Sequence, residues 1–277
     1  IFLGVNFPPG ATLYIDSINF YEVENPYIYH DVGNIILDHG TACGTKVFST
    51  ADLKKQNDFF YDSQNRTLKM YSLCNPAEIY SSIELALDKH IIDINNKSYI
   101  TIDNLALKYG GSCGIFAIDT HHIEIFDCDI SYIGGSVLEW KNGRAERYGN
   151  GVNFLNNTHD NMVEGCNIWE IYDAALTNQG SGDGVQQYNI IYKNNNIWNA
   201  EWSYEYWNDS INGFTSDIYF DNNICQYAGY GWGHSQRPNP SGMHICFPDN
   251  AAQTSKVYIT NNVFKYSTTC NLYVSKR

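Results

Sequence analysis

Apolar and polar residues alternate in a short segment that recurs six times along the chain, and an Asn or Cys follows soon after in most copies. The second apolar residue of the copies falls at Ile102, Ile125, Val163, Tyr192, Phe220 and Ile259. Neighbouring copies are 23 to 39 residues apart, so a basic turn is lengthened by loops in some copies. An alternating strand repeated in this way is typical of a solenoid, in which each turn packs on its neighbours.

Two columns of residues support this interpretation. The residues three positions after each repeat position are Leu105, Cys128, Cys166, Asn195, Asn223 and Asn262, and those five positions after are Leu107, Ile130, Ile168, Ile197, Cys225 and Phe264. Stacked Asn amides can bond the backbone of the turns above and below, while the apolar column fills a core. A β-sandwich would not hold such columns in register. We therefore predict an all-β fold, a single-stranded right-handed parallel β-helix with long loops flanking a groove.

The first part of the chain does not follow the repeat. Residues 58–71 alternate on both sides of a polar turn and predict a β-hairpin. We expect residues 1–98 to form irregular rungs and a hairpin that caps the open end of the solenoid. Residues 99–277 are expected to form the β-helix rungs, in one continuous domain with that first part.

Another short strand, which follows the second strand of each rung, predicts a binding face. Its inward positions are filled by small and aliphatic residues in the early rungs, so the alternate positions are expected to point outward. In three neighbouring rungs the outward set is Asp173, Trp202, Tyr204, Tyr206, Tyr230, Trp232 and His234. Exposed aromatic rings in such a strip are suited to stacking on sugar rings. The alternative is that long loops cover the strip and make it a satellite core.

Two carboxylic acids stand out in this region. Glu205 falls in the column that holds Leu176 in the preceding rung, where burial would raise its pKa and keep it protonated. Asp173, one rung earlier, is expected to point outward and to be ionised. Two carboxyl groups whose pKa values are pushed apart are the arrangement of glycoside hydrolysis. Two structural alternatives stay open: a bulge that turns Glu205 outward, or a buried hydrogen bond without catalytic purpose.

Two long loops are expected to flank the strip. The loop at 139–151 carries Lys141, Arg144, Arg147 and Tyr148, which form the densest basic cluster of the chain. The loop after Gly233 carries Arg237 and His244. Loops of this length on a regular scaffold often build binding sites. We expect Arg147, Tyr148 and Arg237 to bind substrate.

Composition and charge narrow the function. The net charge of −13 excludes a nucleic-acid partner, which needs a basic face. It would also repel an anionic polysaccharide unless a local basic patch or a bound cation intervened. No stretch approaches 18 consecutive apolar residues, so no membrane span is expected.

No cofactor is expected from the motifs. Ca²⁺ is the one metal ion for which the sequence offers ligands, through Asp119, Asp127 and Asp129. At least three of the eight Cys lie in inward columns and are expected to be buried free thiols, while disulfides stay open for the others. The chain opens with Ile1-Phe2-Leu3-Gly4, which suggests a mature form or a fragment whose export signal is gone. We expect a secreted or extracellular protein, with the cell surface as a variant of that location.

Four segments carry a resemblance to a known group of proteins. They are RYGNG at 147–151, YDAALTNQ at 172–179, YEYW at 204–207 and GWGHSQRP at 231–238. With the repeat from residue 99 to 266, they resemble the pectin-lyase-like superfamily of right-handed β-helix proteins. Among these, secreted bacterial polysaccharide lyases and glycoside hydrolases are the most similar. The resemblance implies a polysaccharide or oligosaccharide substrate and adds Gln179 to the expected substrate-binding residues. The clustered Asp of polygalacturonases is absent, and so is the lyase pattern of a Lys or Arg base beside a Ca²⁺ cage.

The leading hypothesis is a glycoside hydrolase with Asp173 as nucleophile or base, Glu205 as acid and His234 tuning charge or donating to substrate. One alternative is a polysaccharide lyase, in which Arg147 or Arg237 neutralises a uronate and Tyr206, Tyr148 or His234 is the base. Another alternative is a non-catalytic glycan-binding or adhesin solenoid, which would need the aromatic strip but no carboxyl pair.

Overall fold

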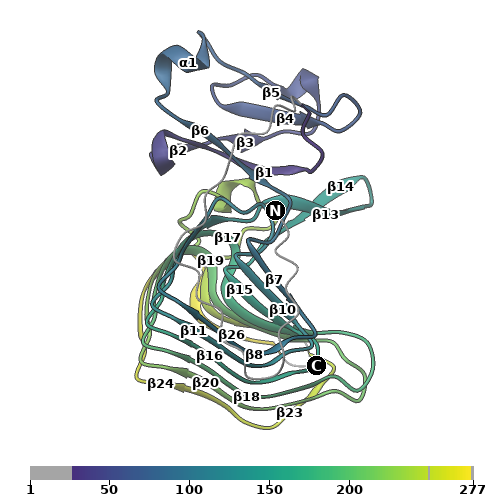
Figure 1. Cartoon of the computed structure of the whole chain (residues 1–277), viewed down its shortest axis with the longest axis vertical. Helices are drawn as coiled ribbons and strands as arrows, with labels where there is room; N and C mark the ends of the chain where they lie inside the picture. Colours follow the sequence, from purple (N-terminus) through teal and green to yellow (C-terminus); the bar gives the residue numbers. More distant parts are fainter. Residues whose placement is uncertain (1–26, 249, 276–277) are drawn as a thin grey trace.

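The computed structural model describes residues 27–248 and 250–275, in which β-strands are the dominant element and helices are few and short. Its main part is a solenoid of stacked parallel strands, shown in Figure 1. One face is a seven-stranded parallel sheet of β8 (Ser98–Asp103), β11 (His121–Phe126), β16 (Thr158–Glu164), β18 (Gln186–Lys193), β20 (Phe214–Asp221), β23 (Gln253–Thr254) and β24 (Val257–Thr260).

The rest of the solenoid is one eleven-stranded parallel sheet that bends around a corner. Its strands before the corner are β9 (Ala106–Lys108), β12 (Asp129–Ile133), β21 (Ile224–Ala228) and β25 (Val263–Ser267), and those after it are β7 (Ile92–Asn95), β10 (Ile115–Ile118), β15 (Val152–Leu155), β22 (Met243–Phe247) and β26 (Cys270–Val274). The long strands β17 (Asn167–Gly180) and β19 (Asn196–Asn208) run through the corner and belong to both parts.

The register of the sheets confirms the repeat read from the sequence. The six repeat positions from Ile102 to Ile259 pair in succession across the seven-stranded sheet. The apolar column from Leu107 to Phe264 pairs in the same way before the corner. Their side chains fill one core along the inside of the solenoid, because every turn presents its apolar positions to the same interior.

An asparagine ladder links the later turns. The backbone N–H of Asn195 donates to Asn223 Oδ1 at 2.9 Å, and that of Asn223 donates to Asn262 Oδ1 at 2.8 Å. The side-chain amide of Asn223 in turn donates to the carbonyl of Tyr192 at 3.0 Å. Each ladder residue follows another Asn with a left-handed backbone, at Asn194, Asn222 and Asn261, which turns the corner. The Asn-Asn pairs therefore supply both the bend and the hydrogen bonds that it leaves open.

The sheet register changes by one residue at the corner of β17 and β19. Before the corner Ile171 pairs with Ala200, and after it Ala174 pairs with Trp202, so the offset falls from 29 to 28 residues. Side chains alternate between the faces of a strand, so a one-residue shift exchanges inside and outside. As a result Tyr204, and not Glu205, aligns with Leu176 in the core.

The expected loop at 139–151 is instead mostly an antiparallel hairpin. Strands β13 (Ser136–Lys141) and β14 (Arg144–Tyr148) are joined by Asn142 and Gly143, with φ values of 53° and 78°. Positive φ at both central residues defines the tight turn for which Asn-Gly is the strongest short signal. Leu138 lies on this hairpin and is 63% exposed, so it takes no part in the solenoid core.

The described residues before the solenoid form a small β unit with its own core. Its elements are β1 (Val32–Leu37), η1 (Asp38–Gly40), β2 (Ala42–Cys43), β3 (Thr45–Lys46), η2 (Thr50–Asp52), β4 (Asp58–Asp62), β5 (Thr67–Met70), α1 (Pro76–Ile79) and β6 (Ile83–Leu87). The antiparallel pair β4–β5 is the hairpin expected at 58–71. Residues 1–26 of the expected N-terminal part lie outside the described residues.

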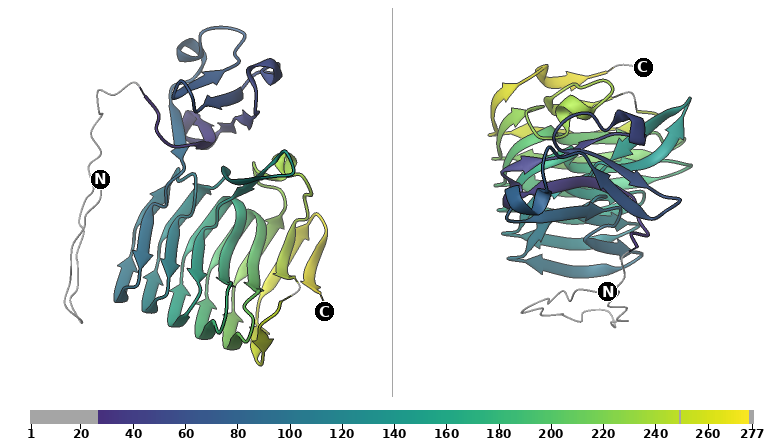
Figure 2. Two further views of the ribbon diagram at one scale, coloured as in Figure 1. Left: turned by 90° about the vertical axis from the view of Figure 1, so that its right-hand side faces the viewer. Right: turned by 90° about the horizontal axis from the view of Figure 1, so that it is seen from above.

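This N-terminal unit lies along the side of the solenoid rather than over its first turn (Figure 2). Tyr132 of an early turn donates to the carbonyl of Gly40 at 2.9 Å, and Gln236 of a late turn donates to that of Gly44 at 3.0 Å. The unit therefore spans several turns and meets the hairpin β13–β14 and the short helix η3 (His234–Gln236).

The eight cysteines are free, and five of them are buried, among them the three expected in inward columns. None of the helices in the described part of the chain has the length and apolar character needed to cross a membrane.

Candidate functional site

The candidate site lies on the outer face of the sheet, just after the corner. Glu205 of β19 pairs with Thr177 of β17, and both side chains point away from the core that Leu176, Tyr204 and Tyr206 fill. The bulge considered in the sequence analysis therefore exists and turns Glu205 outward. Glu205 belongs to one outward column together with Phe116, Asn153 and Thr177.

Glu205 is buried although it points outward, with only 7% of the residue exposed. Gln179 Nε2 donates to Glu205 Oε2 at 2.7 Å, and Thr177 Oγ1 lies 3.5 Å from the same oxygen. Burial, and the nearby carboxyl of Asp173, raise the pKa of Glu205 to about 8. The raised pKa agrees with the expectation, but its cause is a covered outer face and not the solenoid core.

Asp173 lies beside Arg237 at the same place. Arg237 Nη1 is 3.1 Å from Asp173 Oδ1, and the side chains are only 13% and 15% exposed. Burial raises the pKa of Asp173, the guanidinium of Arg237 opposes that rise, and the neighbouring Glu201 adds to it. The expectation that Asp173 lies open on the outer strip was wrong, because its side chain is mostly buried and paired with Arg237. Because only Asp173 has a cation in contact, Glu205 is the carboxyl that keeps its proton to higher pH.

Glu201 is a third buried carboxyl, which the sequence analysis missed. Its side chain is 1% exposed, with Oε2 2.8 Å from His234 Nδ1 and Oε1 3.7 Å from Arg237 Nε. The backbone N–H of Ser241 also donates to Glu201. His234 is thus close to the carboxyl cluster, but it starts η3 and does not lie on a strand of the expected strip. Glu201 positions both His234 and Arg237.

The aromatic residues do not form the open strip that was expected. Arg237 lies over the rings of Tyr172 and Trp202, at 5.0 and 5.1 Å from their centroids. Trp232 packs on Tyr172 at 5.5 Å between centroids, and its indole N–H donates to the carbonyl of Glu170. Trp202 and Trp232 are therefore partly covered, as in the satellite-core alternative. Tyr230 is 56% exposed and lies edge-on to Tyr227.

Tyr204 and Tyr206 are not binding residues, because both lie in the solenoid core. Each is at most 1% exposed, and the Tyr204 hydroxyl donates to Asn178 Oδ1 at 2.6 Å. The Tyr206 hydroxyl is 2.8 Å from Thr254 Oγ1. The one-residue shift at the corner explains this error, because the sequence columns had assumed a constant offset.

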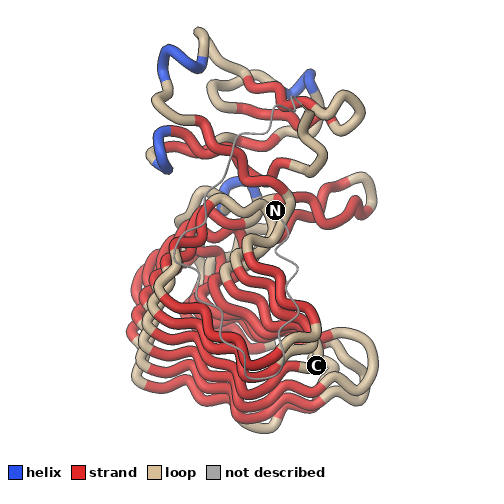
Figure 3. The backbone as a smooth tube through the Cα atoms, viewed as in Figure 1, coloured by secondary structure: helices blue, strands red, loops and turns tan. Residues whose placement is uncertain are grey.

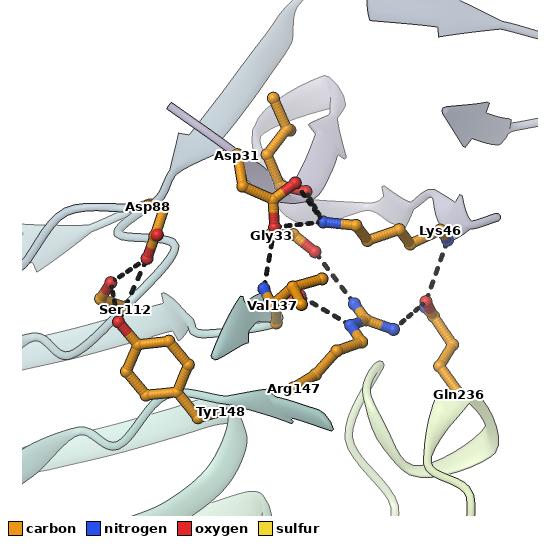
Figure 4. A network of polar contacts seen from close by, with 11 residues as sticks. Asp31, Gly33, Lys46, Asp88, Ser112, Val137, Arg147, Tyr148 and Gln236 are labelled. Atoms are coloured by element: carbon orange, nitrogen blue, oxygen red, sulfur yellow. Dashed lines mark hydrogen bonds and ion pairs between the residues drawn. The ribbon is translucent and has the colours of Figure 1, made fainter. Parts of the chain in front are cut away.

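Arg147 contacts the N-terminal unit, and Tyr148 contacts Asp88, directly after that unit, as Figure 4 shows. Arg147 donates to the carbonyls of Gly135 and Gly33 at 2.6 and 3.0 Å, and to Gln236 Oε1 at 3.1 Å. Tyr148 shares a hydrogen-bond cluster with Ser112 and Asp88, and burial raises its pKa to about 12. Tyr148 is therefore engaged in this cluster and not in the expected groove, whereas Arg147 also lines a depression with Phe48 and Trp140.

Two further residues of the outer face were missed by the sequence analysis. Asn153 Nδ2 donates to Gln179 Oε1 at 3.1 Å, which orients the Gln179 amide toward Glu205. Trp207 pairs with Gln179 on the next strand and shares its outward direction. Once the inserted hairpin is allowed for in the case of Asn153, and the corner shift in the case of Trp207, the sequence would place both residues in the outward columns. Figure 3 shows how the strands carrying these columns run side by side.

The aspartates considered for Ca²⁺ are not gathered into one site. Asp119 accepts a hydrogen bond from Asn157, and Asp129 accepts one from Asn167. Asp127 borders a separate surface depression with Asp103 and Glu164. Within residues 27–248 and 250–275, no group of three or more His, Cys, Asp or Glu is arranged to hold a metal ion.

Comparisons with protein-family models, with curated proteins and with solved structures find no match to this chain.

Proposed function

We propose that the protein is a carbohydrate-active enzyme that cleaves a glycan by hydrolysis, with Glu205 as general acid and Asp173 as base or nucleophile. The observation that carries the proposal is the unequal environment of two neighbouring buried carboxyls. Asp173 contacts a guanidinium, whereas the hydrogen bonds that Glu205 receives from the described part of the chain come from the neutral side chains of Gln179 and Thr177. Such a difference separates an acid from a base.

In this mechanism Glu205 transfers its proton to the glycosidic oxygen as the bond breaks. The carboxylate that remains is stabilised by the Gln179 amide, which already donates to it. Asp173 acts in its ionised form, which Arg237 favours. Glu201 holds both Arg237 and His234 in place, and the His234 side chain is 25% exposed.

The resemblance to the pectin-lyase-like superfamily supports a glycan substrate, since the stacked parallel sheets agree with that fold. Secretion to the cell exterior remains part of the proposal. Two of the three bases considered for the lyase alternative are poorly suited, because Tyr206 lies in the core and the pKa of Tyr148 is raised to about 12. His234 is left as the base of that alternative. Arg237 already contacts two carboxyls, so it is not free to neutralise a uronate.

The test is digestion of a glycan panel by wild type, Glu205→Gln and Asp173→Asn, read by new reducing ends and ultraviolet absorbance. The matched control is Glu124→Gln, an exposed carboxyl on the seven-stranded sheet. Hydrolysis predicts reducing ends without absorbance, at least a hundredfold slower in both site variants and unchanged in the control. Absorbance that grows with cleavage would indicate a lyase, and binding without cleavage would indicate the non-catalytic alternative.

A further inference from the structure

A second cavity lies where three separate parts of the chain meet. The N-terminal unit, the hairpin β13–β14 and the segment around η3 adjoin at this place, as Figure 2 shows. The cavity has a volume of about 380 Å³, and its lining includes Phe48, Trp140, Arg144, Arg147, Arg237 and Pro238. A cavity of this size lies at the lower end of the range for small-molecule sites and accommodates a sugar ring.

An exposed aromatic pair forms one side of this cavity. Trp140 is 59% exposed and Phe48 is 41% exposed, and their rings meet edge to face at 5.4 Å between centroids. Trp140 pairs with Ala145 across the hairpin, one residue pair before the tight Asn142-Gly143 turn. The small Ala145 leaves the indole uncovered from that side, while Phe48 fixes its edge. An indole face held in this way is a platform for the C–H face of a sugar ring.

The other side of the cavity is basic, in a chain whose net charge is −13. Three arginines line it and no Asp or Glu does. Arg147 and Arg237 already have partners in the molecule. Arg144 is exposed, and no hydrogen bond or ion pair engages its guanidinium within the described residues. Its guanidinium is therefore the cation available to a ligand, and its planar fork fits a carboxylate or a sulfate group.

We infer that this cavity binds an anionic sugar ring, stacked on Trp140 and ion-paired with Arg144. The inference deepens the proposed function, on which it rests, because it names an acidic glycan as the substrate class. Arg237 connects the two places, since it lines the cavity and contacts Asp173 of the carboxyl cluster. One sugar ring of a glycan would thus be held at the hairpin, while a later part of the same glycan would reach the carboxyls. The local basic patch overcomes the repulsion that the overall charge would otherwise impose.

The test measures binding of three tetrasaccharides of equal length: one of uronic acids, one sulfated and one neutral. Titration calorimetry would compare wild type with Trp140→Ala, Arg144→Gln and the control Leu138→Ala, an equally exposed residue of the same hairpin outside the cavity lining. Arg144→Gln should weaken binding of an acidic ligand about tenfold or more and leave the neutral ligand unaffected. Trp140→Ala should weaken every ligand that binds, and Leu138→Ala none.

The uronic-acid and sulfated ligands show which anionic group the site prefers. Equal affinity for acidic and neutral ligands, no binding of any of the three, or an equal loss in Leu138→Ala would overturn the inference. Glu205→Gln separates this result from the proposed function, because it should bind like wild type without cleaving. If Glu205→Gln cleaves normally while the hairpin variants lose binding, the proposed catalytic mechanism fails and the binding site stands. If the hairpin variants bind normally while Glu205→Gln is inactive, the binding site fails and the mechanism stands.

Discussion

The side-chain amide of Gln179 donates a 2.7 Å hydrogen bond to Glu205 Oε2 between neighbouring strands of the solenoid. Asn153, one strand further, donates to the oxygen of the same amide and fixes its orientation. An amide N–H can serve Glu205 in either protonation state, because the second carboxyl oxygen can carry the proton. The contact therefore holds the carboxyl in place without supplying the charge that would keep it ionised.

Replacing Glu205 by Gln should stabilise the fold at alkaline pH. The pKa of Glu205 is raised from 4.5 to about 8, so the folded state favours the protonated carboxyl. The stability that this group contributes is fully present below pH 4.5 and is lost as the pH rises toward 8. Glu205→Gln should therefore be more stable than wild type at pH 8. The difference should be a few kcal/mol, because each unit by which folding raises the pKa corresponds to about 1.4 kcal/mol. Urea unfolding at pH 5 and pH 8 measures this, with Glu124→Gln as the control. A variant that is less stable than wild type at pH 8 would contradict the burial of a protonated acid.

Cleavage should depend on the same proton. If Glu205 is the general acid, the rate falls as the pH rises through about 8, where the carboxyl loses its proton. Arg237→Gln removes the cation that opposes the raised pKa of Asp173, so the acidic limb of the profile should move to higher pH. Rates across pH 4–10 for wild type and Arg237→Gln provide the measurement. An acidic limb that stays in place in Arg237→Gln would show that Asp173 is not the base.

The asparagine ladder should be a strong contributor to stability. Asn223→Ala leaves the backbone N–H of Asn195 and the carbonyl of Tyr192 without their side-chain partners inside the solenoid. We expect a loss of about 2–4 kcal/mol in the free energy of unfolding, because buried polar groups without partners are costly. The control is Asn196→Ala, which removes an exposed side chain from the start of β19. Denaturant unfolding of both variants measures this loss. Equal losses of stability in Asn223→Ala and Asn196→Ala would show that the asparagine ladder makes no special contribution.

His244 should make the protein sensitive to acid. It is fully buried, its Nδ1 lies 2.9 Å from Ser203 Oγ, and burial lowers its pKa from 6.5 to about 4. The folded state therefore prefers the neutral ring. This contribution is intact above pH 6.5 and is lost as the pH falls from 6.5 to 4, by about 3 kcal/mol in all. Thermal unfolding between pH 6.5 and pH 4 measures this, and His244→Gln should lose less stability over that range than wild type does. The control is His39→Gln at an exposed position, which should lose as much stability as wild type. The same acid sensitivity in all three proteins would rule out His244 as its source.

The sequence predicted the strands that follow the strict repeat and failed where the chain departs from it. The columns beginning at Ile102 and Leu107 are in register because their spacing is set by whole turns of parallel strands. Beyond the corner, the hairpin β13–β14 adds residues to one turn and the shift after Ile171 removes one from another. Counting from a fixed position therefore assigned Tyr204 and Glu205 to exchanged faces.

Part of the candidate site was predicted from the sequence. The chemical type of its residues pointed to them even where the assumed strand register was wrong. Asp173, Glu205, Gln179 and Arg237 do come together, although the expected reason for the pKa of Glu205 was wrong. Glu201 was missed because nothing local in the sequence distinguishes a carboxyl that η3 folds over. The place of Arg147 depends on the N-terminal unit, more than a hundred residues away in sequence. Such long-range contacts leave no periodic pattern to read.

The interface of the N-terminal unit should depend on Gln236. Gln236 Oε1 accepts hydrogen bonds from the backbone N–H of Lys46 and from Arg147 Nη1, and its amide donates to the carbonyl of Gly44. Gln236→Ala should increase hydrogen exchange at the Lys46 amide at least tenfold. The reason is that the lost hydrogen bond contributes about 1–2 kcal/mol to the free energy of opening this interface. Ser235→Ala, an exposed neighbour, serves as control and should leave that exchange unchanged. Protection at Lys46 that survives Gln236→Ala would show that the other contacts suffice.

The hydrogen bond between Lys46 and Gln236 also means that this interface forms with a delay during synthesis of the protein. The two residues are 190 positions apart, so the N-terminal unit emerges from the ribosome long before the segment that completes its interface. At about 5–20 residues per second, the wait is roughly 10–40 s. During that interval the buried ion pair of Lys46 with Asp31 must be kept by the unit alone, while each new turn of the solenoid adds to the last. The interface can therefore close only after Gln236 has been synthesised, so a chain that stops before Gln236 would lose these contacts while keeping the turns already made.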